Sequence, residues 1–225
     1  MLIVIEGLDG AGKSTQVKLI KEYIKESGKE LEYLHFPRFD APVYGELIAK
    51  FLRGEFGKNE MVHPQLVALL FAQDRADASG MIKEWLSEGR CVLLDRYVYS
   101  NIAYQCSKLK DENEAKELKR WILELEYGTF AIPKPDVNIF LDVPISFVDR
   151  KLKENREGND RGYLKGKTDI HEADIAFQIG VREIYLEQCR EDENFIRVEC
   201  ADGDGEMLPA GVIFGSIRNI IGKLM

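Results

Sequence analysis

The octapeptide 7–14, Gly-Leu-Asp-Gly-Ala-Gly-Lys-Ser, has the residue types and spacing needed to hold a chain of phosphates. It matches the pattern G-x-x-x-x-G-K-[ST], in which glycines let backbone N–H groups approach phosphate oxygens closely. In this pattern the lysine contacts the β- and γ-phosphates, and the serine hydroxyl ligates Mg²⁺. The sequence therefore predicts a nucleoside triphosphate site, with a Gly-rich turn that binds nothing as the plainer alternative. The residues expected to contact phosphate are Gly7, Gly10, Ala11, Gly12, Lys13, Ser14 and Thr15.

Two arginines follow apolar runs further along the chain. Arg38 comes shortly after one run, in Phe36-Pro37-Arg38, and Arg96 follows Asp95 at the end of another. In an open α/β sheet, ligands bind at the edge where the carboxyl ends of the strands meet. The two arginines are therefore predicted to clamp one phosphate of a second substrate through charge-assisted hydrogen bonds. A surface ion pair at each arginine is the plainer alternative.

Short apolar runs alternate with helical patterns along the chain, and these elements must position the motifs. We expect strands at 2–5, 31–36, 91–94, 137–143 and 195–200. We expect helices at 13–27, 63 to about 88 and 170–190. The alternation predicts an α/β fold of the P-loop NTPase type, a three-layer doubly wound, mostly parallel five-stranded sheet flanked by helices. No linker divides the 225 residues, so we expect a single domain over 1–225.

The composition argues against several classes of protein. The net charge of −8 disfavours a general nucleic-acid or membrane-surface binder, because such proteins present basic faces. No apolar run approaches the 18 residues that a membrane span needs, and no signal pattern opens the chain. The cysteines form no C-x-x-C pair that would indicate zinc or redox chemistry; they are Cys91, Cys106, Cys189 and Cys200. We therefore expect a cytoplasmic protein without a nucleic-acid or membrane partner.

The phosphate-binding motif alone does not separate a kinase from a GTPase switch. A switch reads guanine through N-K-x-D after a later strand, and the sequence has no such tetrapeptide. The fragment 134–136, Lys-Pro-Asp, precedes a predicted strand instead of following one. Three interpretations stay open on these residues: a kinase for a phosphorylated acceptor, a related P-loop kinase for another nucleotide or nucleoside, and a nucleotide-binding switch.

Five segments together resemble the thymidylate kinase family over essentially the whole chain. They are 5–14, 36–38, 70–75, 95–105 and 133–136, and the Asp-Arg-Tyr…Ser…Ala-Tyr-Gln stretch at 95–105 is the most specific. The resemblance implies transfer of the γ-phosphate of ATP to dTMP, with ATP as donor and Mg²⁺ as cofactor. It also implies a homodimer whose small-molecule partners are dTMP and ATP.

The resemblance further implies which residues bind dTMP. Phe71 would stack on the base and Arg75 would donate to a base carbonyl. The two can contact the same base because residues four apart share a helix face. Tyr104 would exclude a 2′-hydroxyl, and Asp9 would accept from the 3′-hydroxyl. An ordinary packed helix is the plainer alternative for these positions. The implied dTMP residues are Asp9, Phe36, Arg38, Phe71, Arg75, Arg96, Ser100, Asn101, Tyr104 and Gln105.

A basic, glycine-broken segment supplies the remaining predictions. Residues 150–167 contain seven Lys/Arg against three Asp/Glu, which favours a mobile lid at about 150–168 over a solvated basic loop. Because no arginine lies within 7–14, the arginine on the transferred phosphoryl group is expected from this lid. The expected catalytic residues are Lys13, Asp95, Arg96, Arg156 and Arg161. The expected Mg²⁺ residues are Ser14, Asp9, Asp95 and Glu172.

Overall fold

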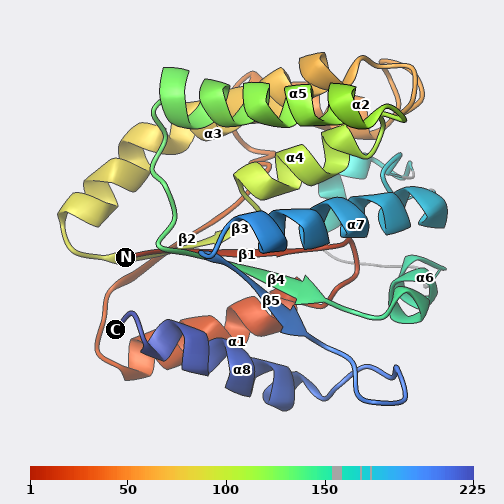
Figure 1. The fold of residues 1–225 in the computed structure, drawn as a ribbon. Coiled ribbons are helices and arrows are strands. Elements are labelled where there is room, and N and C mark those ends of the chain that lie inside the picture. The colour runs from red at the N-terminus through yellow and green to blue at the C-terminus, as the bar shows by residue number, and fades with distance from the viewer. Residues whose placement is uncertain (154–158, 168, 173) are drawn as a thin grey trace.

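The computed structural model describes residues 1–153, 159–167, 169–172 and 174–225 (Figure 1). The strands are β1 (Leu2–Gly7), β2 (Leu31–His35), β3 (Cys91–Asp95), β4 (Val137–Asp142) and β5 (Phe195–Glu199). The helices are α1 (Lys13–Glu26), α2 (Tyr44–Leu52), α3 (Pro64–Ser87), α4 (Val98–Cys106), α5 (Glu112–Leu123), α6 (Ile145–Lys153), α7 (Ile175–Glu191) and α8 (Ala210–Gly222). A single π-helical turn, η1 (Glu124–Thr129), follows α5, and a 3₁₀ helix, η2 (Asn159–Leu164), follows α6.

The five strands form one sheet in the order β2-β3-β1-β4-β5, and every pair is parallel. Strands β1, β3 and β4 are buried along their whole length, which explains why they read as continuous apolar runs instead of alternating ones. Helices α1 and α8 cover one face of the sheet, and α3, α4, α5 and α7 lie on the other (Figure 1). The predicted doubly wound α/β sheet is therefore confirmed, and it is entirely parallel among the described strands.

Two helix starts show how local chemistry sets the boundaries. Helix α3 begins at Pro64 as expected, since proline fits a first helical position and the side chain of His63 accepts from the backbone N–H of Gln65. Helix α7 begins at Ile175, five residues later than predicted, because Asp174 caps it by accepting from the N–H of Ala176 at 2.8 Å. The described residues of 169–172 consequently lie outside the helix.

The sheet register brings the chemically active segments to one edge. Ile5 of β1 and His35 of β2 both pair with Asp95 at the end of β3. The loops that follow β1, β2 and β3 therefore begin side by side at the carboxyl edge, where open α/β sheets bind ligands. Among the helices that the structure describes, none combines the length and the hydropathy that a membrane span requires.

Candidate active site

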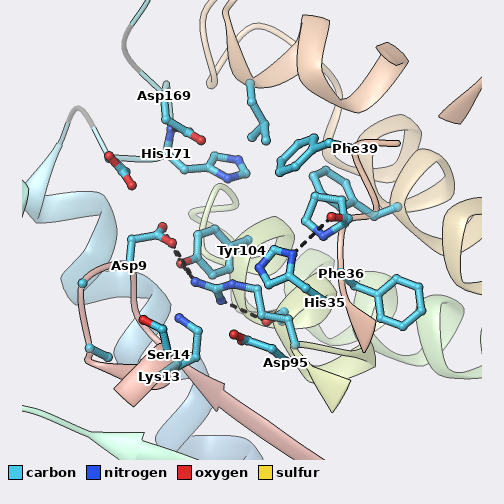
Figure 2. A pocket seen from close by; sticks show the side chains of 18 of the residues that line it. Asp9, Lys13, Ser14, His35, Phe36, Phe39, Asp95, Tyr104, Asp169 and His171 are labelled. Atoms are coloured by element: carbon cyan, nitrogen blue, oxygen red, sulfur yellow. Dashed lines mark hydrogen bonds and ion pairs between the residues drawn. The ribbon is translucent and has the colours of Figure 1, made fainter. Parts of the chain in front are cut away.

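A cavity of about 680 Å³ opens at this carboxyl edge. Its floor is the loop after β1, its walls come from α3 and α4, and the segment before α7 closes the far side (Figure 2). Nearly all of the predicted site residues line it. Those lining residues are Asp9, Gly10, Ala11, Gly12, Lys13, Ser14, Thr15, Phe36, Phe71, Arg75, Asp95, Arg96, Ser100, Asn101, Tyr104, Gln105 and Glu172. Gly7 lies just beneath the loop as the last residue of β1, and Arg38 lies elsewhere.

The loop after β1 wraps the N-terminus of α1 as the motif predicts. Gly12 caps the helix in the left-handed conformation, with φ of 78°, which favours glycine. Lys13 is buried and folds back on the loop, so that its Nζ donates to the carbonyls of Gly7 at 3.3 Å and Leu8 at 3.0 Å. Burial lowers the pKa of Lys13 to about 8, which leaves the amine mostly charged at neutral pH. The loop thus presents N–H groups and a cation to the cavity.

Asp9, Arg96 and Tyr104 form a linked group above this loop. Arg96 Nη2 donates to Asp9 Oδ1 at 2.7 Å and to the Tyr104 hydroxyl at 3.2 Å, and that hydroxyl donates to Asp9 Oδ2 at 2.7 Å. Burial opposes the charged form of Asp9, but the nearby cations of Arg96 and Lys13 outweigh it and hold the pKa of this carboxyl well below its usual range. Arg96 itself has a φ of 68°, a strained value for a residue other than glycine.

A wholly buried carboxylate supports that group from below. Glu6 Oε1 accepts from the backbone N–H groups of Tyr97 at 2.9 Å and Ser100 at 3.2 Å, and thereby satisfies the N-terminus of α4. Glu6 Oε2 accepts from the hydroxyls of Ser100 at 2.5 Å and Tyr185 at 2.9 Å. Because Ser100 Oγ also accepts from Arg96 Nη1 at 3.1 Å, the chain of bonds fixes the arginine in place.

The opposite end of the cavity is lined by α3 and α4. Phe71 and Arg75 share one face of α3, as their spacing predicts. Arg75 is buried and forms two parallel hydrogen bonds to Glu126 of η1, from Nε to Oε2 at 2.5 Å and from Nη2 to Oε1 at 2.7 Å. Burial opposes its charge, but Glu126 outweighs that effect and raises the pKa of Arg75. Asn101 Nδ2 donates to the same Glu126 Oε1 at 3.0 Å.

The structure does not bring Arg38 together with Arg96 at the cavity, so the two-arginine clamp stays a prediction. Its guanidinium turns away from the cavity onto α3, where Nε donates to Asp74 Oδ1 at 2.8 Å and Nη2 donates to Asp77 Oδ2 at 2.6 Å. The backbone N–H of Arg38 also donates to Asp74 Oδ2 at 2.9 Å. Two acidic partners one helical turn apart thus hold this arginine, and Arg96 is the member of the predicted pair that faces the cavity.

The segment before α7 faces the phosphate loop across the cavity (Figure 2). Asp169 accepts from the Tyr163 hydroxyl at 2.7 Å, and burial together with the charge of Asp9 raises the pKa of Asp169 to about 7. His171 follows two residues further on. It is buried, packs at 5.0 Å from the Tyr104 ring, and has its pKa lowered to about 3 by burial.

The side-chain oxygens predicted to ligate Mg²⁺ differ in whether other residues already hold them. Asp95 is buried, and its Oδ1 has no hydrogen-bond partner among the described residues, while Ser14 lies exposed at the cavity wall. Asp9, in contrast, is engaged at both oxygens by Arg96, Tyr104 and Gln178. Asp95 and Ser14 therefore fit a cation that keeps waters and phosphate oxygens in its shell.

Two predicted residues fall outside what the structure describes. Arg156 lies in 154–158, outside the described residues, and the side chain of Arg161 in η2 is likewise outside them. The prediction that one of them supplies the catalytic arginine stays a prediction.

Three residues that support the site were not among the predicted site residues: Glu6, Glu126 and Tyr185. Glu6 was readable as a charged residue inside an otherwise apolar strand, which indicates a buried and satisfied carboxylate. Glu126 carried no such signal, because it lies among several acidic residues of an apparently ordinary helix end. Its burial depends on the π turn, a feature that often marks functional sites.

Together the fold and site define a P-loop phosphotransferase. The first strand of a parallel sheet runs into a phosphate-binding loop at a helix N-terminus, and the adjoining cavity also includes residues of α3 and α4 that an acceptor could contact.

Comparison with known proteins identifies the family. The thymidylate kinase family model matches residues 5–206. The thymidylate kinase of Mycobacterium tuberculosis strain H37Rv is 34% identical over 187 residues, which are 83% of this chain and 85% of that protein. That of Plasmodium falciparum is 37% identical over 156 residues, 69% of this chain and 67% of that protein. The structure of a thymidylate kinase from Candida albicans aligns with a TM-score of 0.74 and 26% identity, covering 99% of this chain and 91% of that one.

The chain belongs to the thymidylate kinase family. It is a kinase that transfers the γ-phosphate of ATP to dTMP, giving dTDP and ADP.

Proposed function

We propose that dTMP lies along the cavity with its base at Phe71 and Arg75 and its phosphate toward Arg96 and the loop after β1. The observation that carries this placement is the single cavity that joins the phosphate loop to an aromatic ring with a guanidinium beside it. A ring can stack on a pyrimidine, and a guanidinium donates to its carbonyl. The proposed base site lies away from Lys13. The phosphates of ATP can then occupy the loop while dTMP is bound.

The sugar of dTMP is proposed to pack against Tyr104. The hydroxyl of this residue is held by Asp9 and Arg96, so the ring has little freedom to move aside for a 2′-hydroxyl. Asp9 is proposed to accept from the 3′-hydroxyl. Ser100 and Gln105 complete the wall, and Phe36 closes it from the β2 side.

The chemistry proposed for this chain is positioning and charge neutralisation. The acceptor phosphate has a second pKa of about 6 and is mostly a dianion at neutral pH, so no general base is needed. Lys13 and Arg96 supply positive charge where negative charge spreads during transfer. Lys13 is buried and the Arg96 side chain is 11% exposed, so little water screens their interaction with phosphate.

Mg²⁺ is proposed to be held by Ser14 and Asp95, with Glu172 nearby in the cavity wall. When bound, it would neutralise charge on the β- and γ-phosphate oxygens. Asp9 is proposed as a sugar contact instead of a metal ligand, because its oxygens are engaged by Arg96 and Tyr104.

The chain is proposed to be one kinase domain over 1–225 with a basic lid at about 150–168. The lid arginines are tested by the double variant Arg156→Ala/Arg161→Ala, assayed at saturating ATP and dTMP. We expect kcat to fall by ~10³ or more, since an arginine on the transferred phosphoryl group contributes ~10³–10⁵. Wild-type kcat in the folded double variant would remove the lid from the mechanism.

A homodimer is proposed on exposed apolar residues that lie just before α2, just before α3 and within α3. Val43, Met61 and Leu66 are 70%, 75% and 64% exposed, and Met81 lies further along α3. Large exposed apolar side chains favour protein contact. Sedimentation of the wild type and of Leu66→Glu tests this proposal.

A cytoplasmic location is proposed on the four free cysteines.

A coupled ADP-release assay across all nucleoside monophosphates tests the placement of dTMP. The proposal expects turnover with dTMP to exceed that with every other acceptor. Equal turnover with a purine monophosphate would contradict a base site built around Phe71 and Arg75.

A further inference from the structure

We propose that Glu126 is a specificity-determining residue that makes the cavity select thymine over cytosine by fixing both groups that read the base. This inference rests on the proposed placement of the base at Phe71 and Arg75. It assigns to the π turn η1 a function that lies outside the phosphate-binding machinery. Glu126 positions its neighbours and is not itself a base contact.

The carboxylate of Glu126 is fully used inside the protein. Its Oε1 accepts from Arg75 Nη2 at 2.7 Å and from Asn101 Nδ2 at 3.0 Å, and its Oε2 accepts from Arg75 Nε at 2.5 Å. Glu126 is 0% exposed and the side chain of Arg75 is 2% exposed, so no water competes for these bonds. Buried two-point pairs of this kind fix the plane of the guanidinium.

The bonds to Asn101 fix the direction of its amide. Besides Glu126, the nitrogen Nδ2 donates to the Ala68 carbonyl at 3.0 Å, so both of its protons are taken. Both neighbours are acceptors, which requires the nitrogen and not the oxygen to face them. Asn101 is 3% exposed and lines the cavity, and its Oδ1 has no partner among the described residues. Only an acceptor is therefore left for a ligand.

A donor from Arg75 and an acceptor from Asn101 match thymine and oppose cytosine. Thymine presents a carbonyl at position 4 and an N–H at position 3, whereas cytosine presents an amino group and a bare nitrogen there. With cytosine, the Arg75 donor would face the 4-amino group, which is also a donor. The Asn101 acceptor would face the bare N3, which is also an acceptor. Mismatched buried polar groups of this kind reject a ligand far more strongly than a lost apolar contact does.

Glu126→Gln tests the proposal, because an amide cannot satisfy the same three donors. If its nitrogen takes the place of Oε1, it faces both Arg75 Nη2 and Asn101 Nδ2. The Asn101 amide then cannot satisfy this nitrogen and the Ala68 carbonyl together, so its direction is no longer fixed. If its nitrogen takes the place of Oε2, it faces Arg75 Nε, and the guanidinium loses its fixed plane. Either arrangement weakens the contacts to thymine and relaxes the opposition to cytosine.

The measurement is kcat/KM for dTMP and for dCMP in the coupled ADP-release assay. We expect Glu126→Gln to lower the value for dTMP by roughly 10- to 100-fold and to raise the dCMP:dTMP ratio at least about tenfold. The matched control is Glu124→Gln, an exposed carboxylate on the same turn, which should leave both values unchanged. If Glu126→Gln does not fold, Glu126→Asp keeps the buried charge, withdraws the carboxylate, and should raise the same ratio.

Two results overturn the proposal and are distinguishable from each other. A folded Glu126 variant with weaker dTMP turnover but an unchanged dCMP:dTMP ratio would show that Glu126 only stabilises the fold. Unchanged dTMP affinity in Arg75→Ala, measured by calorimetry, would show that the base does not lie at this end of the cavity. In that second case the proposed placement of dTMP fails together with the inference.

Discussion

The two ends of the cavity hold their charged groups in different ways. At the phosphate end, Arg96 pairs with Asp9 through side chains that are 11% and 22% exposed, and Lys13 folds onto loop carbonyls. At the base end, Arg75 pairs with Glu126 through side chains that are 2% and 0% exposed. The first set of contacts consists of bonds that an incoming phosphate can replace. The second set is sealed by packing before any base arrives.

This difference matches what each end has to recognise. A phosphate is a strong charge that can compete with carbonyls and a carboxylate for a cation, so the donors need only be near. A base is neutral and is distinguished from its competitors only by the order of its donors and acceptors. Its reading groups must therefore be fixed in advance, and a buried carboxylate does that at the cost of desolvation.

Among changes at the two ends of the cavity, the largest effect is expected at the phosphate end. We expect Lys13→Ala to lower kcat by ~10²–10³, because one preorganised charge near the transferred group is lost. Affinity for dTMP, measured by calorimetry, should stay within about twofold, since Lys13 lies away from the proposed base site. The control is Lys18→Ala, an exposed lysine on the same helix. Near-normal kcat in Lys13→Ala would remove this residue from the mechanism.

The next largest effect is expected from a substitution at the base end of the cavity. Phe71→Ala should weaken dTMP binding by about 1–3 kcal/mol, the value of stacking one base on an aromatic ring. ATP affinity should not change, because in the proposed placement Phe71 contacts the base of dTMP and no part of ATP. Titration calorimetry with each nucleotide separates the two effects. An equal loss for ATP and dTMP would mean that the variant disturbs the whole cavity.

Between the two ends, Tyr104 separates the effect of a ring from that of its hydroxyl. Tyr104→Ala should reduce the preference for dTMP over its ribonucleotide counterpart about tenfold or more, because the ring no longer occupies the space of a 2′-hydroxyl. Tyr104→Phe keeps the ring and should retain that preference. Competition kinetics with the two acceptors provide the ratio, and an unchanged ratio in the alanine variant would contradict the proposed sugar contact.

The smallest expected effect concerns a lysine outside both ends. Lys108 Nζ is buried without a hydrogen-bond partner among the described residues, 4.9 Å from the Phe51 ring centre, and burial lowers the pKa of Lys108 to about 7. The unfolded chain binds this proton up to about pH 10.4, so the free energy of unfolding should rise as pH increases from about 7 to 10. Lys108→Met should abolish that rise.

Thermal unfolding at two pH values checks this prediction. We expect Lys108→Met to raise Tm by a few degrees at pH 7 and by less at pH 9.5, since the variant removes an unpaired buried cation. Lys110→Met, at an exposed position two residues on, should show no such difference. An equal Tm gain at both pH values would contradict the lowered pKa.

The same contrast explains what could be predicted from the sequence. The phosphate loop was predictable because its glycines, lysine and serine act within one short segment that backbone geometry fixes. The ion pairs of Arg38 were not predictable, since its two acidic partners lie 36 and 39 residues away on α3 and only the fold brings them together. Glu126 was missed because its burial requires a π turn and a partner 51 residues away.

The decisive measurement is a crystal structure of this chain with dTMP. We expect the Arg75–Glu126–Asn101 group to keep its present bonds, with Arg75 on the base O4 and Asn101 Oδ1 on the base N3–H. We also expect Arg96 to exchange its bond to Asp9, now 2.7 Å, for the acceptor phosphate. A thymine bound away from Phe71, or an Arg75–Glu126 pair that opens to receive it, would contradict the account.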